Sequence, residues 1–223
     1  DTNEPWWEGM DGVQPNSLLD WQGKRFDSSG GEKAAHPNSR FTVSITQCPT
    51  LSKEFDNPKG VPISAIIFGG GRAKLTPLVY ESFNWQHGVF NAARMGSETT
   101  AAAAHAVGQL RRDPMAMLPF CGYNMADYFR HWLNVGKRCA NPPKIFFVNW
   151  FRTDDSGNFI WPGFRENIRA LKWIIERLNA NNMRAKETPI GFTPDFQDLE
   201  ISVLNISKED LMKLLSVDLS EWA

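Results

Sequence analysis

One apolar run constrains the fold of this chain more than any other feature. Ile63–Phe68 is almost continuously apolar, and three glycines follow it directly. An apolar run of this length, ended by glycine, is typical of a strand that is buried on both faces of a sheet. We therefore expect the chain to fold around a sheet that contains this strand.

Other segments predict further strands and helices. β-Branched and aromatic runs bounded by Pro, Gly or Asn predict strands at Arg40–Ile45, Val61–Phe68, Pro77–Trp85 and Lys144–Phe151. Apolar residues at helical spacing predict a helix over Arg165–Leu178, one from Met125 that ends near Gly136, and one headed by Ser207 in a capping-box-like start. Strands and helices are mixed rather than strictly alternating. The predicted class is therefore α/β, with a mixed sheet and flanking helices.

The composition changes near residue 40. Residues 1–39 are rich in Gly, Pro, Asn, Asp and Trp without sustained periodicity. We interpret them as a turn-rich segment that continues from a missing amino-terminal part. Residues 40–223 are expected to form the larger domain.

Charge and cysteine content exclude several classes of protein. The net charge is −1, which leaves no electrostatic footprint for nucleic acid or for an anionic membrane surface. No apolar run approaches the roughly 20 residues of a membrane helix, so we expect a soluble protein. The three cysteines, Cys48, Cys121 and Cys139, lie far apart. This usage favours a reducing compartment over a disulfide scaffold or a zinc site.

Two segments offer groups that can bind anions. Arg40 follows the Pro37–Ser39 turn at the start of a predicted strand. Its guanidinium could hold a carboxylate or phosphate at two points there. The alternative is a solvated arginine on a surface turn. Gly69–Gly71 would let backbone N–H groups approach a ligand, with Arg72 supplying charge, but an ordinary tight turn has the same composition.

Two further segments suggest a lid and an aromatic site. Gly96–Gln109 has helical propensity yet lacks an apolar stripe, so a helix and a mobile lid are equally consistent with it. Asn149–Phe151 and Phe159–Asn167 gather large rings around a loop. These rings could stack on a purine, with Asn167 reading the edge of the base, or they could form a small satellite core at the head of the following helix.

Together these segments resemble the GTP-dependent phosphoenolpyruvate carboxykinases. The motifs Pro-Asn-Ser-Arg-Phe, Pro-Leu-Val-Tyr-Glu-Ser-Phe-Asn-Trp, Gly-Ser-Glu-Thr-Thr-Ala-Ala-Ala and Phe-Ile-Trp-Pro-Gly-Phe-Arg-Glu-Asn run in the order and spacing of that family. The resemblance implies part of a carboxykinase-type nucleotide-binding domain. It also implies the family's reaction, in which oxaloacetate and GTP give phosphoenolpyruvate, CO2 and GDP, a step of gluconeogenesis.

The resemblance also implies roles for particular residues. Asn38 and Arg40 match the contacts to oxaloacetate or phosphoenolpyruvate, and Arg72 matches a phosphate contact. Phe151, Phe159 and Phe164 match the aromatic slot for guanine, with Trp161 beside it and Asn167 at the guanine edge. Ser97 and Glu98 match the hinge of the family's mobile lid. The lid itself matches residues 99–109, which include Thr99, Thr100, Ala101, Ala102, Ala103, Ala104 and His105.

The family uses Mn²⁺ and Mg²⁺, and the ligands of these ions are expected to precede Asp1. The family's phosphate loop is also expected to precede Asp1, because this sequence contains no GxxxxGK[ST] pattern. The resemblance implies a cytoplasmic and monomeric whole enzyme, and predicts that this chain alone is inactive. The alternative is a non-catalytic module or degenerate fragment that only binds a guanine nucleotide. One departure is Gly71, which stands where the family usually has the first of two arginines.

Overall fold

The computed structural model describes residues 5–8, 10, 13–36, 43–99, 106–179, 185–204, 206–218 and 220. The chain divides into two compact units, and the larger comprises Pro62–Thr99 with Val107–Ala223. The described residues before Pro62 hold two single-turn 3₁₀ helices, η1 (Ser28–Gly30) and η2 (Ile45–Gln47). None of the described helices is both long enough and apolar enough to cross a membrane.

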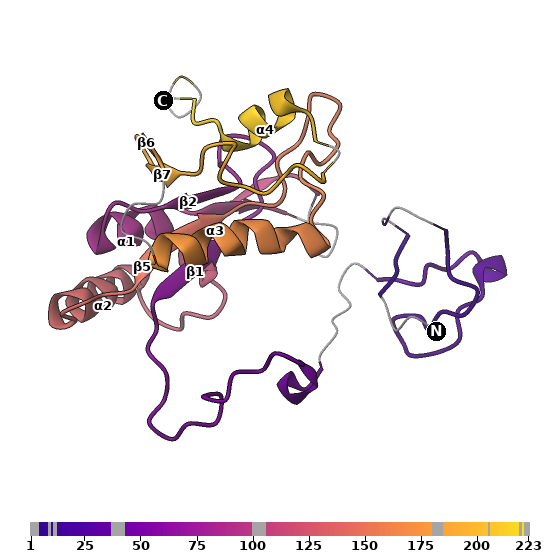
Figure 1. The fold of residues 1–223 in the computed structure, drawn as a ribbon, viewed down its shortest axis with the longest axis horizontal. Helices are drawn as coiled ribbons and strands as arrows, with labels where there is room; N and C mark the ends of the chain where they lie inside the picture. The colour runs from indigo at the N-terminus through magenta and orange to yellow at the C-terminus, as the bar shows by residue number, and fades with distance from the viewer. Residues whose placement is uncertain are drawn as a thin grey trace. The chain divides into compact units, whose positions relative to one another are not determined.

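A five-stranded mixed sheet organises the larger unit (Figure 1). In spatial order its strands are β1 (Ala65–Gly69), β5 (Lys144–Val148), β2 (Val79–Glu81), β7 (Gly191–Thr193) and β6 (Lys186–Thr188). β1 and β5 are parallel, whereas the other neighbours are antiparallel. A separate two-stranded ladder joins β3 (Gly96–Glu98) to β4 (Leu110–Arg112). The predicted α/β class with a mixed sheet is confirmed.

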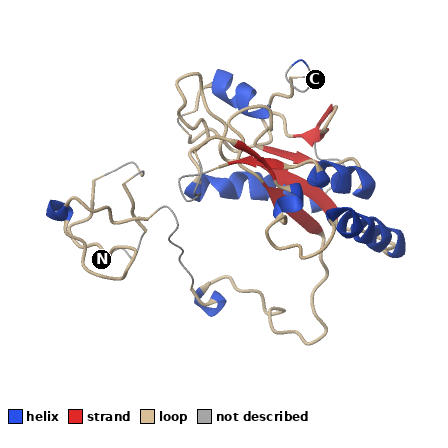
Figure 2. Ribbon diagram, turned by 180° about the vertical axis from the view of Figure 1, so that it is seen from behind, coloured by secondary structure: helices blue, strands red, loops and turns tan. Residues whose placement is uncertain are grey.

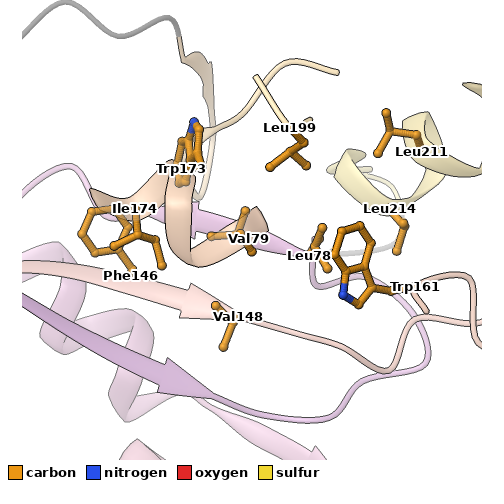
Figure 3. Close-up of a cluster of buried hydrophobic side chains, with 11 residues drawn as sticks. Leu78, Val79, Phe146, Val148, Trp161, Trp173, Ile174, Leu199, Leu211 and Leu214 are labelled. Atoms are coloured by element: carbon orange, nitrogen blue, oxygen red, sulfur yellow. The ribbon is translucent and has the colours of Figure 1, made fainter. Parts of the chain in front are cut away.

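The two faces of the sheet carry different cores, because successive side chains of a strand point to opposite faces. Val79, Phe146 and Val148 face the core that α3 (Asn167–Asn179) and α4 (Lys208–Leu215) cover, as Figure 3 shows. Tyr80, Ile145 and Phe147 face the core that α1 (Trp85–Ala93) and α2 (Met125–Arg138) cover. Figure 2 shows the sheet from behind, with helices on both sides of it. The central strands of the sheet are therefore packed against helices on both faces.

Three of the four predicted strands are present in the sheet. β5 and β2 lie within predicted strands, and β1 overlaps the predicted strand Val61–Phe68 but ends one residue later, at Gly69; each is shorter than predicted. The strand predicted at Arg40–Ile45 is wrong over its described part, because Ser44 caps η2. Burial of Ile63–Phe68 on both faces is also wrong: Ile63 is 70% exposed and Ile67 is 41% exposed. β1 is an edge strand among the described strands, so only one of its sides is paired.

The helix predictions rested on apolar residues at helical spacing and, for the helix headed by Ser207, on a capping signal. α4 begins as predicted, with Ser207 Oγ accepting from the backbone N–H of Asp210 at 3.0 Å. α2 runs to Arg138, two residues beyond Gly136. α1 was not predicted, because its first residue was assigned to the preceding strand. The missed signal is Asn84, whose side chain caps the helix by accepting from the N–H of His87 at 2.9 Å.

Candidate functional site

Asn149, which directly follows β5, joins the glycine-rich segment to the aromatic segment. Its Oδ1 accepts from the N–H of Arg72 at 3.0 Å and from the N–H of Phe151 at 3.1 Å. Its Nδ2 donates to the carbonyls of Arg72 and Thr76 at 2.8 and 2.9 Å. The residue is 1% exposed. One buried amide therefore holds two loops whose sequences lie more than seventy residues apart.

The β3–β4 ladder holds the same glycine-rich segment from another side. Ser97 Oγ accepts from the N–H of Gly71 at 2.9 Å, and Glu98 Oε1 accepts from the N–H of Ala73 at 3.0 Å. The backbone N–H of Glu98 also donates to the carbonyl of Gly71 at 2.8 Å. Ser97 and Glu98, predicted as the hinge of a lid, thus fix the loop that follows β1.

The helix considered for Gly96–Gln109 is wrong for its described residues. Gly96–Glu98 is a strand, and residues 106–109 contain no helix. Thr99 N–H donates to the carbonyl of Gln109, and Gly108 N–H donates to the carbonyl of Thr99, at 2.9 and 2.8 Å. These bonds extend the ladder beyond Glu98. Thr100–His105, the centre of the predicted lid, lie outside the described residues, and so do Asn38 and Arg40.

Gly71 and Arg72 face opposite sides of their loop. A Cβ on Gly71 would lie 3.1 Å from Cδ2 of the Phe151 ring. The Arg72 guanidinium instead lies near Gly96, where Nη1 is 3.7 Å from the position of a Cβ, and Nε is 3.7 Å from Glu98 Oε1. The absence of a side chain at position 71 therefore leaves room for the Phe151 ring, and Arg72 points beneath the ladder.

Three phenylalanine side chains are exposed at the end of the sheet that carries this loop. Phe151, Phe159 and Phe164 are 41%, 63% and 50% exposed. The rings of Phe151 and Phe159 meet edge to face, with centroids 5.7 Å apart. Phe164 has a φ of 32°, which non-glycine residues seldom adopt, directly after Gly163 at φ 73°. The exposed rings of Phe151 and Phe159 therefore leave apolar surface available to a flat ligand.

Trp161 and Asn167 form a pair next to these rings. Trp161 is 1% exposed and belongs to the core beneath α3, where Figure 3 shows it near Leu78 and Leu214. Its Nε1 donates to Oδ1 of Asn167, the first residue of α3, at 2.8 Å. The bond fixes the Asn167 amide with its oxygen engaged, and Nδ2 makes no hydrogen bond to a described residue.

With this geometry in place, the comparisons identify the family. The family described as the phosphoenolpyruvate carboxykinase C-terminal P-loop domain matches residues 1–223. The chain belongs to the GTP-dependent phosphoenolpyruvate carboxykinases. It is 55% identical to the phosphoenolpyruvate carboxykinase (GTP) of Thermoplasma volcanium over 99% of this chain and 37% of that protein. It is 52% identical to the Chlamydia muridarum enzyme of the same name over 97% of this chain and 36% of that protein.

The chain spans little more than a third of the length of these curated carboxykinases. Within the described residues, no group of three or more His, Cys, Asp or Glu side chains is placed to hold a metal ion. These residues therefore do not fit the Mn²⁺ or Mg²⁺ that the carboxykinase resemblance implies, and we assign no metal ligand in them.

Proposed function

We propose that this chain supplies the guanine-nucleotide site of a GTP-dependent phosphoenolpyruvate carboxykinase. The whole enzyme converts oxaloacetate and GTP to phosphoenolpyruvate, CO2 and GDP, and we propose that it is a cytoplasmic monomer that uses Mn²⁺ and Mg²⁺. The observation that carries the proposal is the contact between the exposed rings of Phe151 and Phe159, together with the exposed Phe164 and the oriented amide of Asn167 in the same short segment of sequence as Phe159.

The rings are proposed to bind the face of guanine. In other proteins, stacking of one base on an aromatic side chain contributes about 1–3 kcal/mol by alanine substitution. Phe164, three residues before α3, is half exposed, and Phe151 packs over Gly71. A nucleotide in this slot would cover apolar surface that is now in water. Stacking alone accepts any base, so preference for guanine requires a polar contact.

Asn167 is proposed to provide that contact. Because Trp161 Nε1 donates to Oδ1, the amide of Asn167 is held in one orientation, in which Nδ2 is available as a donor. Guanine presents the acceptor O6 where adenine presents an amino donor. A fixed donor therefore favours guanine, and leaves the adenine amino group facing another N–H. In this proposal Trp161 is a positioning residue that acts through Asn167.

The substrate end of the site is proposed to involve Asn38 and Arg40, as the carboxykinase resemblance implies. A guanidinium fork can hold a carboxylate at two points and orient it for transfer of the γ-phosphoryl group. The lid, 99–109, is proposed to close over the substrates and exclude water. Ser97 and Glu98 would couple its position to the glycine-rich loop, because both bind the backbone of that loop.

Substitution of Phe164 by alanine tests the guanine slot. In the purified protein we expect Phe164→Ala to weaken GTP binding by about 10- to 100-fold, equivalent to roughly 1–3 kcal/mol for one stacked base. Oxaloacetate binding is expected to change little. Both are measured by titration calorimetry. Phe55, which is 51% exposed in the smaller unit, provides a matched control, and Phe55→Ala is expected to leave both affinities unchanged.

Equal losses for GTP and oxaloacetate in Phe164→Ala would remove the guanine-slot assignment. An assay with GTP, oxaloacetate and Mn²⁺, made on the whole protein to which this chain belongs because the chain alone is predicted to be inactive, separates the two functional hypotheses. Turnover supports the carboxykinase, whereas GTP binding without turnover supports a module that only binds a guanine nucleotide.

A further inference from the structure

Arg152 is a buried arginine that directly follows Phe151 in the sequence, and it is only 6% exposed. An arginine is seldom buried to this extent unless its N–H groups have partners. The guanidinium donates twice to Ser216: Nη1 to the backbone carbonyl and Nη2 to Oγ, both at 3.0 Å. One buried side chain therefore holds a residue that lies 64 positions further along the chain.

Ser216, which follows α4 as its C-cap residue, is itself held in place. Its hydroxyl donates to the carbonyl of Lys213 at 2.9 Å, so the same oxygen is free to accept from Arg152. The end of α4 is attached to the sheet, because the carbonyl of Leu214 accepts from the N–H of Leu78 at 2.9 Å. Figure 3 shows Leu78 and Leu214 in the core that α4 covers. Arg152 therefore binds a point that is fixed relative to the sheet.

The backbone around Arg152 connects two of the exposed rings. The carbonyl of Arg152 accepts from the N–H of Ile160 at 3.0 Å, and Thr153 forms an antiparallel bridge with Phe159. Phe151 precedes Arg152 and Phe159 precedes Ile160, and the two rings meet with centroids 5.7 Å apart. A shift of Arg152 would therefore move both rings.

We propose that Arg152 and Ser216 are positioning residues of the guanine slot, which hold the rings of Phe151 and Phe159 in the geometry that accepts a base. This inference rests on the proposed function of the rings. A binding site must hold its contacting groups within about 0.5 Å of the productive geometry, and buried hydrogen bonds behind those groups provide this precision. Arg152 acts through the two rings and is not assigned a contact with the nucleotide.

Ser216→Ala in the whole protein to which this chain belongs tests the inference. The variant removes Oγ and leaves the carbonyl that accepts from Nη1. We expect the affinity for GTP to fall by about threefold to tenfold, because a hydrogen bond to a charged group is lost. The affinity for oxaloacetate, and turnover at saturating GTP, should not change. Titration calorimetry and a steady-state assay measure these quantities.

Two further variants test the chemistry of the contact. Ser216→Thr keeps a hydroxyl and should bind GTP nearly as well as the unchanged protein. Arg152→Lys keeps the charge but lacks the planar fork that reaches two acceptors at once, so we expect a loss of about tenfold in GTP affinity.

A double variant distinguishes positioning from general stabilisation. If Ser216 acts through the rings, Ser216→Ala should cost little in a protein that already carries Phe159→Ala, with a further loss of GTP affinity below about twofold. The same loss in both backgrounds, or no loss from Ser216→Ala in the unchanged protein, overturns the inference and leaves the guanine slot standing. If Phe159→Ala by itself does not weaken GTP binding, the guanine slot is wrong, and the inference falls with it.

Asp155→Asn is the matched control. Asp155 pairs with Lys213 at 2.8 Å, so it joins the same loop to the same helix as Arg152 does, but its side chain is fully exposed. Exposed ion pairs contribute little to a structure. The affinity of Asp155→Asn for GTP should therefore equal that of the unchanged protein, and a loss as large as that of Ser216→Ala would contradict a specific role for the buried contact.

Discussion

At the residue scale, Asn149 anchors the glycine-rich loop. Both amide hydrogens and the amide oxygen of Asn149 bind backbone groups of Arg72, Thr76 and Phe151. Asparagine is well suited to this position, because one short side chain carries donors and acceptors together. Asp or Leu would fit the space but would leave several of these backbone groups without partners.

Asn149→Ala is expected to lower the free energy of unfolding by at least about 3 kcal/mol, because each buried group left unpaired costs roughly 1–3 kcal/mol. Urea denaturation of the purified protein, followed by circular dichroism, measures the change. Asn158→Ala is the control: Asn158 is exposed, and its side chain donates to Asp154 alone among the described residues. A loss below about 1 kcal/mol for Asn149→Ala would mean that water replaces the amide.

At the element scale, α1 and α2 meet through a glycine. A Cβ on Gly136 would lie 2.3 Å from Cδ1 of Trp85, which is only 8% exposed and donates its Nε1–H to the carbonyl of Trp132 at 2.9 Å. The indole of Trp85 therefore occupies the space beside Gly136. This contact explains why a glycine is present within α2, which continues to Arg138. The last turn instead carries Lys137 and Arg138, which favour a helix C-terminus.

Gly136→Ala tests this packing. Alanine favours an exposed helix by about 1 kcal/mol, yet here it must displace a buried indole, and overpacking usually costs about 1–3 kcal/mol. We expect a net loss of stability of roughly 2 kcal/mol and a change in near-ultraviolet circular dichroism from Trp85. Gly122→Ala, with no atom within 4 Å of the new Cβ, should change neither signal. An unchanged or raised melting temperature for Gly136→Ala would contradict the packing.

At the scale of the whole larger unit, a buried charge connects the sheet to α3. Glu81 of β2 is 4% exposed and pairs with Arg177 of α3 at 2.6 Å and with Lys144 of β5 at 2.9 Å. Arg177 also lies over the rings of Trp173 and Phe192, so it contacts both α3 and β7. The Glu81 carboxylate thus joins β2 to β5 and α3, and Arg177 extends these contacts to β7.

Glu81→Gln is expected to lower the free energy of unfolding by about 3 kcal/mol, because breaking a buried ion pair by removing one partner is strongly destabilising. Thermal unfolding at low and high salt measures this, and the loss should depend little on salt. Glu200→Gln removes the carboxylate of an exposed pair with Lys172 and should have little effect. Comparable losses in the two variants would show that burial of Glu81 is energetically unimportant.

The sequence by itself determined the elements whose signals are local. β5 and β2 were found from apolar β-branched runs, and α3 and α4 were found from helical spacing and from a Ser207 cap. These signals act over a few residues, so they do not depend on the fold. Family motifs, and not periodicity, selected Phe151, Phe159, Phe164 and Asn167 as candidates for the nucleotide site.

Only the tertiary structure decided how those residues are used. Phe159 and Phe164, which are exposed, and Trp161, which is buried, lie in one short motif, and no pattern in that motif distinguishes them. The role of Asn149 depends on a partner 77 residues away, and that of Gly136 depends on an indole from another helix. Contacts of this kind form because the sheet brings distant segments together. Burial and hydrogen bonding between distant segments therefore cannot be predicted from neighbouring residues alone.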